Sequence, residues 1–324
     1  MKAIVRIKYG SPDVLELREI DKPTPTNNQI LVRMQAAAVN PLDWHILRGK
    51  PFMVRLMGFG LLKPKQQILG ADMAGQIEAI GKDVTLFKVG DEAFGSSMGG
   101  FAEYALIHES QAAAKPATMT FEQAAAVPVA GLTALQALRE HGQIQNGQHV
   151  LINGASGGVG TFAVQIAKAL GAHVTGVCSG KNVELVRSIG ADHVIDYTKD
   201  EFWKSGKKFD LIVDNAAFHS ISKPLRVLKP TGIYVGVGGS SSTTSILQSL
   251  IFNPIIAKMK GKKVISFMAN VNQADLIFMK ELLEAGKVVP VIDRKYSLIE
   301  TPEAIRYVEK GHAQGKVVIT FEEK

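Results

Sequence analysis

His149-Val-Leu-Ile-Asn-Gly-Ala-Ser-Gly-Gly-Val-Gly160 is the stretch of this sequence that decides the fold. The apolar run 150–152 has the length and residue types of a buried parallel strand. A turn with glycines at 154, 157, 158 and 160 follows it. The next segment repeats apolar residues at helical spacing, as Phe162, Ile166 and Leu170. A strand, a glycine turn and a helix in this order favour pyrophosphate binding, because glycines admit phosphates to the backbone and the helix N-terminus offers unpaired N–H groups.

The glycine spacing differs from the usual G-x-G-x-x-G pattern, so a purely structural turn is the alternative. The downstream sequence favours the nucleotide interpretation. Strand candidates alternate with a capped helix, in the order His173–Cys178, Val183–Ile189, Val194-Ile195, Phe209–Val213 and Gly232–Val237. Such alternation requires crossover connections and predicts an α/β fold with a doubly wound parallel sheet.

The end of the second strand indicates which dinucleotide binds. NAD sites usually place a carboxylate about 20 residues beyond the glycines, on the ribose 2′-hydroxyl. The corner Cys178–Asn182 contains no Asp or Glu, and offers instead the Ser179 hydroxyl and the Lys181 ammonium. These groups favour a 2′-phosphate, so the predicted cofactor is NADPH. The alternatives are that Lys181 is an ordinary surface lysine and that Tyr197, beyond the next strand, is a packing residue.

Composition narrows the functional classes. The chain has 324 residues, 46% hydrophobic and 21% charged, as is typical of globular proteins, and a net charge of +7. Its basic residues are scattered and are not interleaved with aromatics, a pattern that argues against a nucleic-acid partner. Cys178 is the only cysteine, which excludes an internal disulfide and a cysteine-cluster zinc site. We see no secretory signal and no apolar run of membrane-spanning length, and expect cytoplasmic residence.

The flanking regions have a different pattern. Residues 1–115 contain short, regularly spaced strand candidates, among them Val14–Glu19, which predict a small barrel or sandwich. The segment Gly49–Gln67 is expected to be a long apolar loop that forms a lid or a binding wall. Phe121–Gly142 is predicted to be a helix in two parts, Ser240–Lys262 to be helical with breaks, and Lys263–Met268 to be a last strand.

Eight motifs together resemble the medium-chain dehydrogenase/reductase superfamily, in its zinc-free quinone oxidoreductase branch. They are Ala36–Asp43, Gly70–Asp72, Val89–Asp91, Gly99–Tyr104, Gly131–Ala134, Gly154–Gly160, Gly190–Tyr197 and Gly311–Lys316. The resemblance covers essentially the whole chain. It implies a Rossmann domain, 124–271, inserted into a GroES-like β-barrel domain, 1–123 plus 272–324. It also implies an electrophilic small-molecule substrate in the cleft between the domains, and a homodimer in which the last apolar strand pairs across the axis.

The resemblance further implies a set of cofactor-binding residues. Gly154, Ser156, Gly157, Gly158, Val159 and Gly160 are expected at the pyrophosphate. Ser179, Lys181 and Tyr197 are expected at the adenosine phosphate, Asn215 at the ribose and Thr133 near the nicotinamide. Val237, Phe267, His312 and Ala313 are expected to complete the cofactor site. Relatives often carry an arginine where this chain has Gln314, so a charge from that position is in doubt.

The zinc ligands of the related alcohol dehydrogenases are replaced here, and no metal is predicted. Asn40 and Ala71 stand at two ligand positions, and a carboxamide and a methyl group do not make a zinc site. Hydride transfer from NADPH to a quinone or an α,β-unsaturated carbonyl is therefore the predicted reaction. Asn40 is predicted to donate a hydrogen bond to the developing oxyanion, with Asp43 holding it in place. The alternative is that this segment only caps a helix.

Two other functions are alternatives. In related 2-enoyl-thioester reductases a tyrosine proton donor follows the Asn-Pro-x-Asp segment, and Gly49–Phe52 contains none. A nucleotide-gated RNA-binding protein without catalytic activity is the alternative from a different class. Salt-sensitive RNA binding that NADPH displaces would indicate it.

Overall fold

The computed structural model describes residues 1–216, 219–237 and 261–321, so most of the predicted helical segment 240–262 lies outside the described residues. The chain divides into two compact units. The first unit comprises residues 1–132, 271–284 and 290–324, and the second comprises 133–270 and 285–289. No helix in the described part is long and apolar enough to cross a bilayer.

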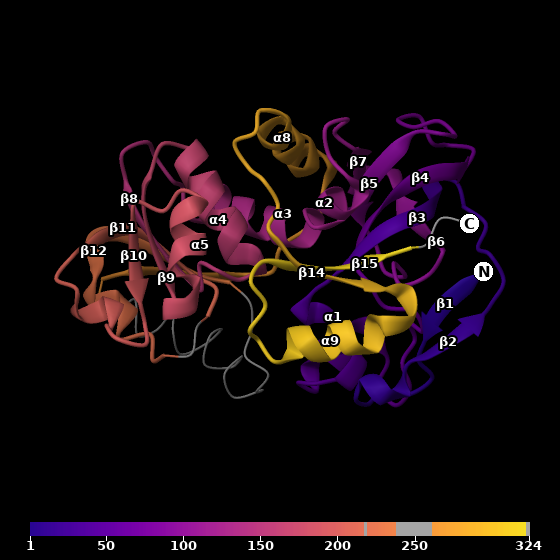
Figure 1. The fold of residues 1–324 in the computed structure, drawn as a ribbon, viewed down its shortest axis with the longest axis horizontal. Helices are drawn as coiled ribbons and strands as arrows, with labels where there is room; N and C mark the ends of the chain where they lie inside the picture. Colours follow the sequence, from indigo (N-terminus) through magenta and orange to yellow (C-terminus); the bar gives the residue numbers. More distant parts are fainter. Residues whose placement is uncertain (217–218, 238–260, 322–324) are drawn as a thin grey trace. The chain divides into compact units, whose positions relative to one another are not determined.

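The second unit is built on a six-stranded sheet in which all neighbouring strands are parallel (Figure 1). In chain order the strands are β8 (His149–Asn153), β9 (His173–Cys178), β10 (His193–Asp196), β11 (Phe209–Asp214), β12 (Leu228–Val237) and β13 (Lys263–Phe267). Their spatial order, β10-β9-β8-β11-β12-β13, is the doubly wound arrangement of dinucleotide-binding folds. It confirms the predicted Rossmann sheet, and the strand order reverses between β8 and β11.

Helices of the second unit pack on this sheet because their apolar faces need cover. Figure 1 shows α4 (Gly158–Ala169) and α5 (Val183–Ser188) beside the strands they connect. The α4 residues Phe162 and Ile166, predicted from their spacing, are fully buried. Leu151, Trp203 and Tyr234 belong to a buried apolar cluster of this unit. The helix begins at Gly158, earlier than predicted, because the last glycines of the turn are already helical.

The first unit contains a seven-stranded sheet and a two-stranded sheet. The larger sheet has the order β14-β15-β3-β4-β5-β7, with β6 also paired to β3, and its pairs are antiparallel except β14–β15. Its strands are β3 (Gln29–Val39), β4 (Asp72–Ile80), β5 (Glu92–Ser96), β6 (Tyr104–His108), β7 (Ala112–Ala114), β14 (Ile292–Ser297) and β15 (Lys316–Thr320). The smaller sheet pairs β1 (Lys2–Val5) with β2 (Glu16–Glu19).

The helices of the first unit are α1 (Pro41–Arg48), α2 (Phe121–Ala125), α8 (Gln273–Glu284) and α9 (Thr301–Glu309). The predicted two-part helix is confirmed as α2 followed by α3 (Pro128–Gln136), with the break before Pro128. Two predictions need correction. The strand predicted from Val14 begins at Glu16, because Pro12–Val14 form a 3-10 turn. The predicted loop 49–67 is not wholly irregular, since Arg55–Phe59 form a π-helical turn.

Candidate functional site

The glycine turn of the second unit lies where β8 ends and α4 begins, at the reversal of strand order. Gly154 adopts a left-handed backbone with φ +73°. A Cβ on Gly160 would lie 2.1 Å from the Gly154 carbonyl oxygen, so this position admits only glycine. A Cβ on Gly157, the residue before α4, would have the Gly154 carbonyl oxygen as its nearest atom, at 3.5 Å. The space beside Gly157 is therefore open to a ligand rather than filled by protein.

Ser156 and Asn182 form a polar pair beside this turn. The Asn182 side-chain amide donates to Ser156 Oγ at 2.9 Å, although the two residues are 26 positions apart. Asn182 is 6% exposed, and its Oδ1 is buried with no hydrogen-bond partner in the structure. A buried amide oxygen without a partner is costly, and it is satisfied only when a donor from a ligand or water reaches it. Asn182 is not among the residues predicted from the sequence, where its position before α5 is the local signal that could have found it.

The corner after β9 contains a carboxylate that the sequence analysis did not anticipate. Asp196, the last residue of β10, is in register with Cys178, and a Cβ on Gly180 would lie 2.6 Å from its Oδ2. The pKa of Asp196 is lowered mainly by hydrogen bonds from the Thr198 hydroxyl and backbone N–H, which outweigh the effect of burial. The Gly180 N–H makes a smaller contribution in the same direction. The carboxylate is therefore ionised and engaged with donors of its own loop.

The three residues predicted at the adenosine phosphate lie around this corner. Ser179 directly follows β9, and Lys181 is exposed in the next turn. The Tyr197 side chain is 59% exposed, so its ring is not part of a core, and its backbone N–H donates to the Cys178 carbonyl at 3.0 Å. The structure thus brings together the strand ends on which these residues lie.

A buried polar network fixes the ends of β8 and β11. Asp214 is 3% exposed and accepts hydrogen bonds from Asn153 Nδ2 and from the Tyr234 hydroxyl, both at 2.8 Å. Burial first, and then the charge of Asp214, raise the pKa of Tyr234 well above its usual value, so the phenol stays a donor. Asn215, predicted at the ribose, donates its side-chain amide to the Asn153 carbonyl at 3.1 Å, and its Oδ1 is buried without a partner. This second unpartnered amide oxygen lies at the same sheet edge as the glycine turn.

The remaining predicted cofactor residues are distributed over both units. Thr133 lies in α3, and Val237 and Phe267 end the neighbouring strands β12 and β13. The Phe267 ring packs on His141, with ring centroids 4.2 Å apart. His312 and Ala313 belong to the first unit, in the turn between α9 and β15, and His312 is exposed.

The first unit contains a buried charged triad, which consists of Asn40, Asp72 and Lys316. Lys316 Nζ donates to Asn40 Oδ1 at 2.6 Å and to Asp72 Oδ2 at 3.0 Å, and Asn40 Nδ2 donates to that same carboxylate oxygen at 2.8 Å. All three side chains are at most 3% exposed. Asp72 Oδ1 accepts a further bond from the Val129 N–H at 2.8 Å. Asn40 is also the N-cap residue of α1, and its N–H donates to Asp43 in a capping box, so the segment caps the helix as the alternative interpretation predicts. The bonds of the Asn40 side chain to Asp72 and Lys316 are additional to that cap.

Asp43 holds the backbone around the triad. Its Oδ2 accepts the Asn40 N–H at 2.7 Å and its Oδ1 accepts the Gly70 N–H at 3.0 Å, so one carboxylate ties the start of α1 to the segment before β4. Burial raises the pKa of Asp43 to about 7, against the effect of these two backbone donors. The nearby charge of Asp72 raises it further and that of Lys316 lowers it. Asp43 thus contacts the backbone of Asn40, and the catalytic role predicted for the two residues stays a prediction.

Asp72 and Lys316 are not among the site residues predicted from the sequence. Both belong to quoted motifs, Gly70–Asp72 and Gly311–Lys316, but 244 positions separate them. Only the pairing of β15 and β4 with β3 brings them to Asn40, which follows the last residue of β3.

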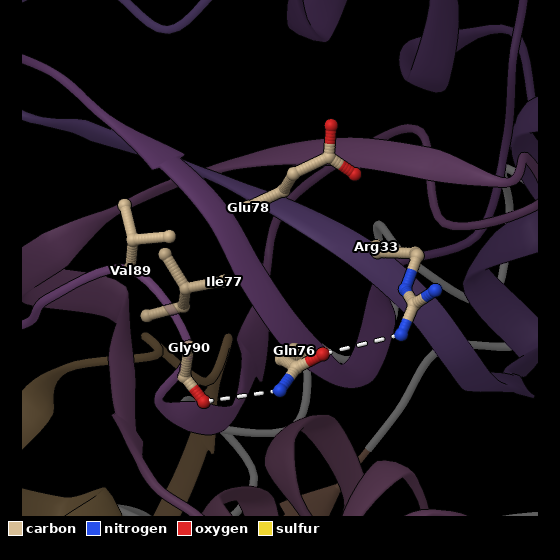
Figure 2. Close-up of a pocket in the computed structure, with 6 residues that line it drawn as sticks. All are labelled: Arg33, Gln76, Ile77, Glu78, Val89 and Gly90. Carbon is tan, nitrogen blue, oxygen red and sulfur yellow. Dashed lines mark hydrogen bonds between the residues drawn. The ribbon is translucent and has the colours of Figure 1, made fainter.

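The first unit also carries an open hollow on its sheet, shown in Figure 2. In it the Gln76 amide links two neighbours, donating to the Gly90 carbonyl and accepting from Arg33, both at 3.2 Å. None of the residues predicted to bind cofactor or to act in catalysis lines this hollow.

Two protein-family models match the chain. The model described as the alcohol dehydrogenase GroES-like domain matches residues 26–117, and the one described as zinc-binding dehydrogenase matches residues 189–319. A curated relative from Mus musculus, the mitochondrial NAD(P)H oxidoreductase RTN4IP1, is 35% identical over 98% of this chain and 89% of its own. The 2-methylene-furan-3-one reductase of Solanum lycopersicum is 33% identical over 98% of this chain and 79% of its own.

Solved structures show the same fold along the full length. The quinone oxidoreductase of Coxiella burnetii superimposes with a TM-score of 0.89 and is 30% identical, and the match covers 99% of each chain. Both halves of the predicted architecture, the GroES-like domain and the Rossmann sheet, therefore have counterparts in known proteins.

Proposed function

The chain belongs to the quinone oxidoreductase branch of the medium-chain dehydrogenase/reductase superfamily, and from this membership we propose that it is an NADPH-dependent, zinc-independent reductase of quinones or α,β-unsaturated carbonyls. Relatives whose names specify NAD(P)H, a quinone or an enone substrate support this proposal. The observation that carries it is the nucleotide site of the second unit.

The second unit offers what a dinucleotide requires. The glycine turn leaves open space beside Gly157 at the N-terminus of a 12-residue helix, where backbone N–H groups attract phosphate. The unpartnered Oδ1 atoms of Asn182 and Asn215 suit ligand donors such as ribose hydroxyls. When bound, the nicotinamide supplies the hydride. The protein binds and orients the nucleotide, with Ser156 held in place by Asn182.

A preference for NADPH follows from the charges at the β9 corner. The Lys181 ammonium is exposed and suits a 2′-phosphate, with Ser179 as a neutral donor. Asp196 is a carboxylate beside this corner and opposes this preference. Its Oδ1 already accepts the Thr198 hydroxyl and backbone N–H, which leaves that oxygen less free to accept a ribose 2′-hydroxyl as NAD sites require.

Zinc independence is supported by the donor chemistry of the buried triad. The family model that matches residues 189–319 is described as zinc-binding, but the residues that the family resemblance places at two metal-ligand positions, Asn40 and Ala71, offer a carboxamide and a methyl group. The Lys316 ammonium contacts both Asn40 and Asp72, so the oxygen donors of this site already hold a cation. Zinc requires thiolate, imidazole or carboxylate donors without a competing positive charge. These residues do not fit a zinc site.

The triad gives Asn40 and Asp43 positioning roles in our proposal. Both Asn40 amide hydrogens point to protein acceptors, Asp72 Oδ2 and, at 3.4 Å, the Ala38 carbonyl. Asn40 therefore orients the Lys316 ammonium, and Asp43 fixes the backbone that carries Asn40. Quinones and enones spread the incoming charge by delocalisation, so their reduction needs less help from a Lewis acid than that of a saturated carbonyl.

A steady-state panel tests the proposal. Oxidation of NADPH and of NADH is measured with quinones, enones, simple ketones and a crotonyl thioester as acceptors, in the presence and absence of a chelator. We expect turnover of quinones or enones with NADPH, unchanged by the chelator. Lys181→Glu should weaken NADPH binding roughly 10-fold or more and leave NADH binding nearly unchanged, whereas Lys82→Glu, on the first unit, should change neither. Metal-dependent turnover of a saturated alcohol or ketone would refute the proposal.

The proposal includes a homodimer. Among the described residues β13 is the outer strand of the parallel sheet, and no described strand pairs with its other edge, which we propose pairs with a second copy. Sedimentation equilibrium at several concentrations should show a two-chain species, and a monomer at all concentrations would contradict it.

A further inference from the structure

The long segment between α1 and β4 has an unusual charge pattern. From Trp44 to Ala71 the sequence contains no Asp or Glu but five cations, at Arg48, Lys50, Arg55, Lys63 and Lys65. The net charge of the whole chain is +7. We call residues 50–65 the basic apolar loop. Its charge is sufficient to set the local field of this surface.

The same loop exposes a concentration of large apolar side chains. Phe52, Met53, Leu56, Met57, Leu61 and Leu62 are between 44% and 86% exposed, with Leu62 the most exposed of all. Scattered exposed hydrophobic residues are normal, but six within eleven positions mark an interaction surface.

The loop is held in place by contacts at its base. The Tyr9 hydroxyl donates to the carbonyls of Phe59 and Gly60, at 2.8 and 2.5 Å. The Lys65 N–H closes the loop on the Phe59 carbonyl at 2.9 Å, and the Arg55 guanidinium lies 4.3 Å from the centre of the Tyr9 ring. The exposed side chains are therefore carried by a backbone anchored to the first unit.

Three of the cations are available to a partner. Lys50, Lys63 and Lys65 are exposed, and among the residues that the structure describes none of them pairs with a carboxylate. Arg48 differs, because it pairs with Glu309. Lysines next to exposed Leu, Met and Phe side chains match the two layers of an anionic bilayer surface, with phosphates outside and acyl chains beneath.

We propose that the basic apolar loop docks this protein onto the surface of an anionic membrane. Charge complementarity selects this partner. A second copy of the chain in a symmetric contact would bring lysines against lysines, and a neutral apolar partner would leave the cations unused. The inference is independent of the proposed reductase activity, since it rests on the first unit alone.

Vesicle co-sedimentation of the full chain without nucleotide tests the proposal. The probes are vesicles of phosphatidylcholine alone and vesicles that also contain phosphatidylglycerol. We expect binding to the anionic vesicles and its weakening by salt. The double variant K63Q/K65Q should bind about 30-fold more weakly, at about fivefold per lysine. L61S/L62S should lose about 10-fold, because two apolar side chains no longer enter the interface.

Matched controls separate docking from general charge effects. K82Q/K88Q removes two exposed lysines elsewhere on the first unit and should bind as the wild type does. Urea midpoints of all variants should be unchanged, since the substituted side chains are exposed. Failure of the wild type to bind anionic vesicles would overturn the proposal, as would equal weakening by K82Q/K88Q. An oligomer that L61S/L62S dissociates, with no vesicle binding, would assign the loop to a second copy instead.

Discussion

Replacing Lys316 by methionine tests the buried triad most directly. Methionine keeps an unbranched chain of similar length but removes the ammonium that contacts Asp72 Oδ2 at 3.0 Å and Asn40 Oδ1 at 2.6 Å. Asp72 is fully buried, so the variant leaves a carboxylate whose remaining donors are Asn40 Nδ2 and the Val129 N–H. We expect K316M to be strongly destabilised.

The distance sets the magnitude. Two unit charges 3.0 Å apart attract each other by about 5 kcal/mol at an effective dielectric constant of about 20. Breaking a buried ion pair by removing one partner costs about 3–5 kcal/mol, because the other charge stays desolvated. D72N, which instead leaves the Lys316 ammonium uncompensated, should cost a similar amount. The double variant K316M/D72N removes both charges and should cost about 3 kcal/mol less than the sum of the single variants.

The assay is urea unfolding of the full chain, followed by far-ultraviolet circular dichroism at neutral pH. The slopes of the transitions should stay constant, so that midpoints report the free energy of unfolding. Additivity of the two substitutions within about 0.5 kcal/mol would refute the argument, because it would show that the charges do not interact. A cost of K316M below about 1 kcal/mol would refute it equally, since surface ion pairs have that size.

Three further predictions concern single side chains. Because burial raises the pKa of Asp43 to about 7 from an ordinary value near 4, the folded state binds a proton that the unfolded state has released between these pH values. The free energy of unfolding should therefore fall by about 1.4 kcal/mol per pH unit as the pH rises through this window. Urea unfolding at a series of pH values should show that D43N does not have this pH dependence. G160A should destabilise the protein by at least about 2 kcal/mol, since its Cβ would overlap the Gly154 carbonyl oxygen. G157A should fold normally, because the space beside Gly157 is open, and should lose nucleotide binding in a fluorescence titration. Normal NADPH binding by G157A would contradict the proposed nucleotide site. Y234F should lower the free energy of unfolding by about 1–3 kcal/mol, because it removes the hydroxyl that donates to the buried Asp214. An unchanged urea midpoint would show that this hydrogen bond contributes nothing to the stability of the fold.

The sequence by itself determined the local structure and the class of fold. The strand at 149–153, the glycine turn and the helix that follows are set by apolar periodicity and by glycine geometry within a dozen residues. The break at Pro128 and the buried face of α4 follow from the same local rules. Alternation of strands and helices then leaves few topologies, so the parallel sheet of the second unit was predictable.

Only the tertiary structure decided which polar groups meet. Lys316 joins Asn40 because β15 pairs with β3, and Asp196 reaches Gly180 because β10 lies in register with β9. The burial that raises the pKa of Asp43, and that leaves the Asn182 Oδ1 without a partner, likewise depends on the packing of distant segments. Sequence periodicity shows which side of an element is buried, but a hydrogen bond or an ion pair depends on ångström-scale distances between elements, and the assembled fold alone sets those distances.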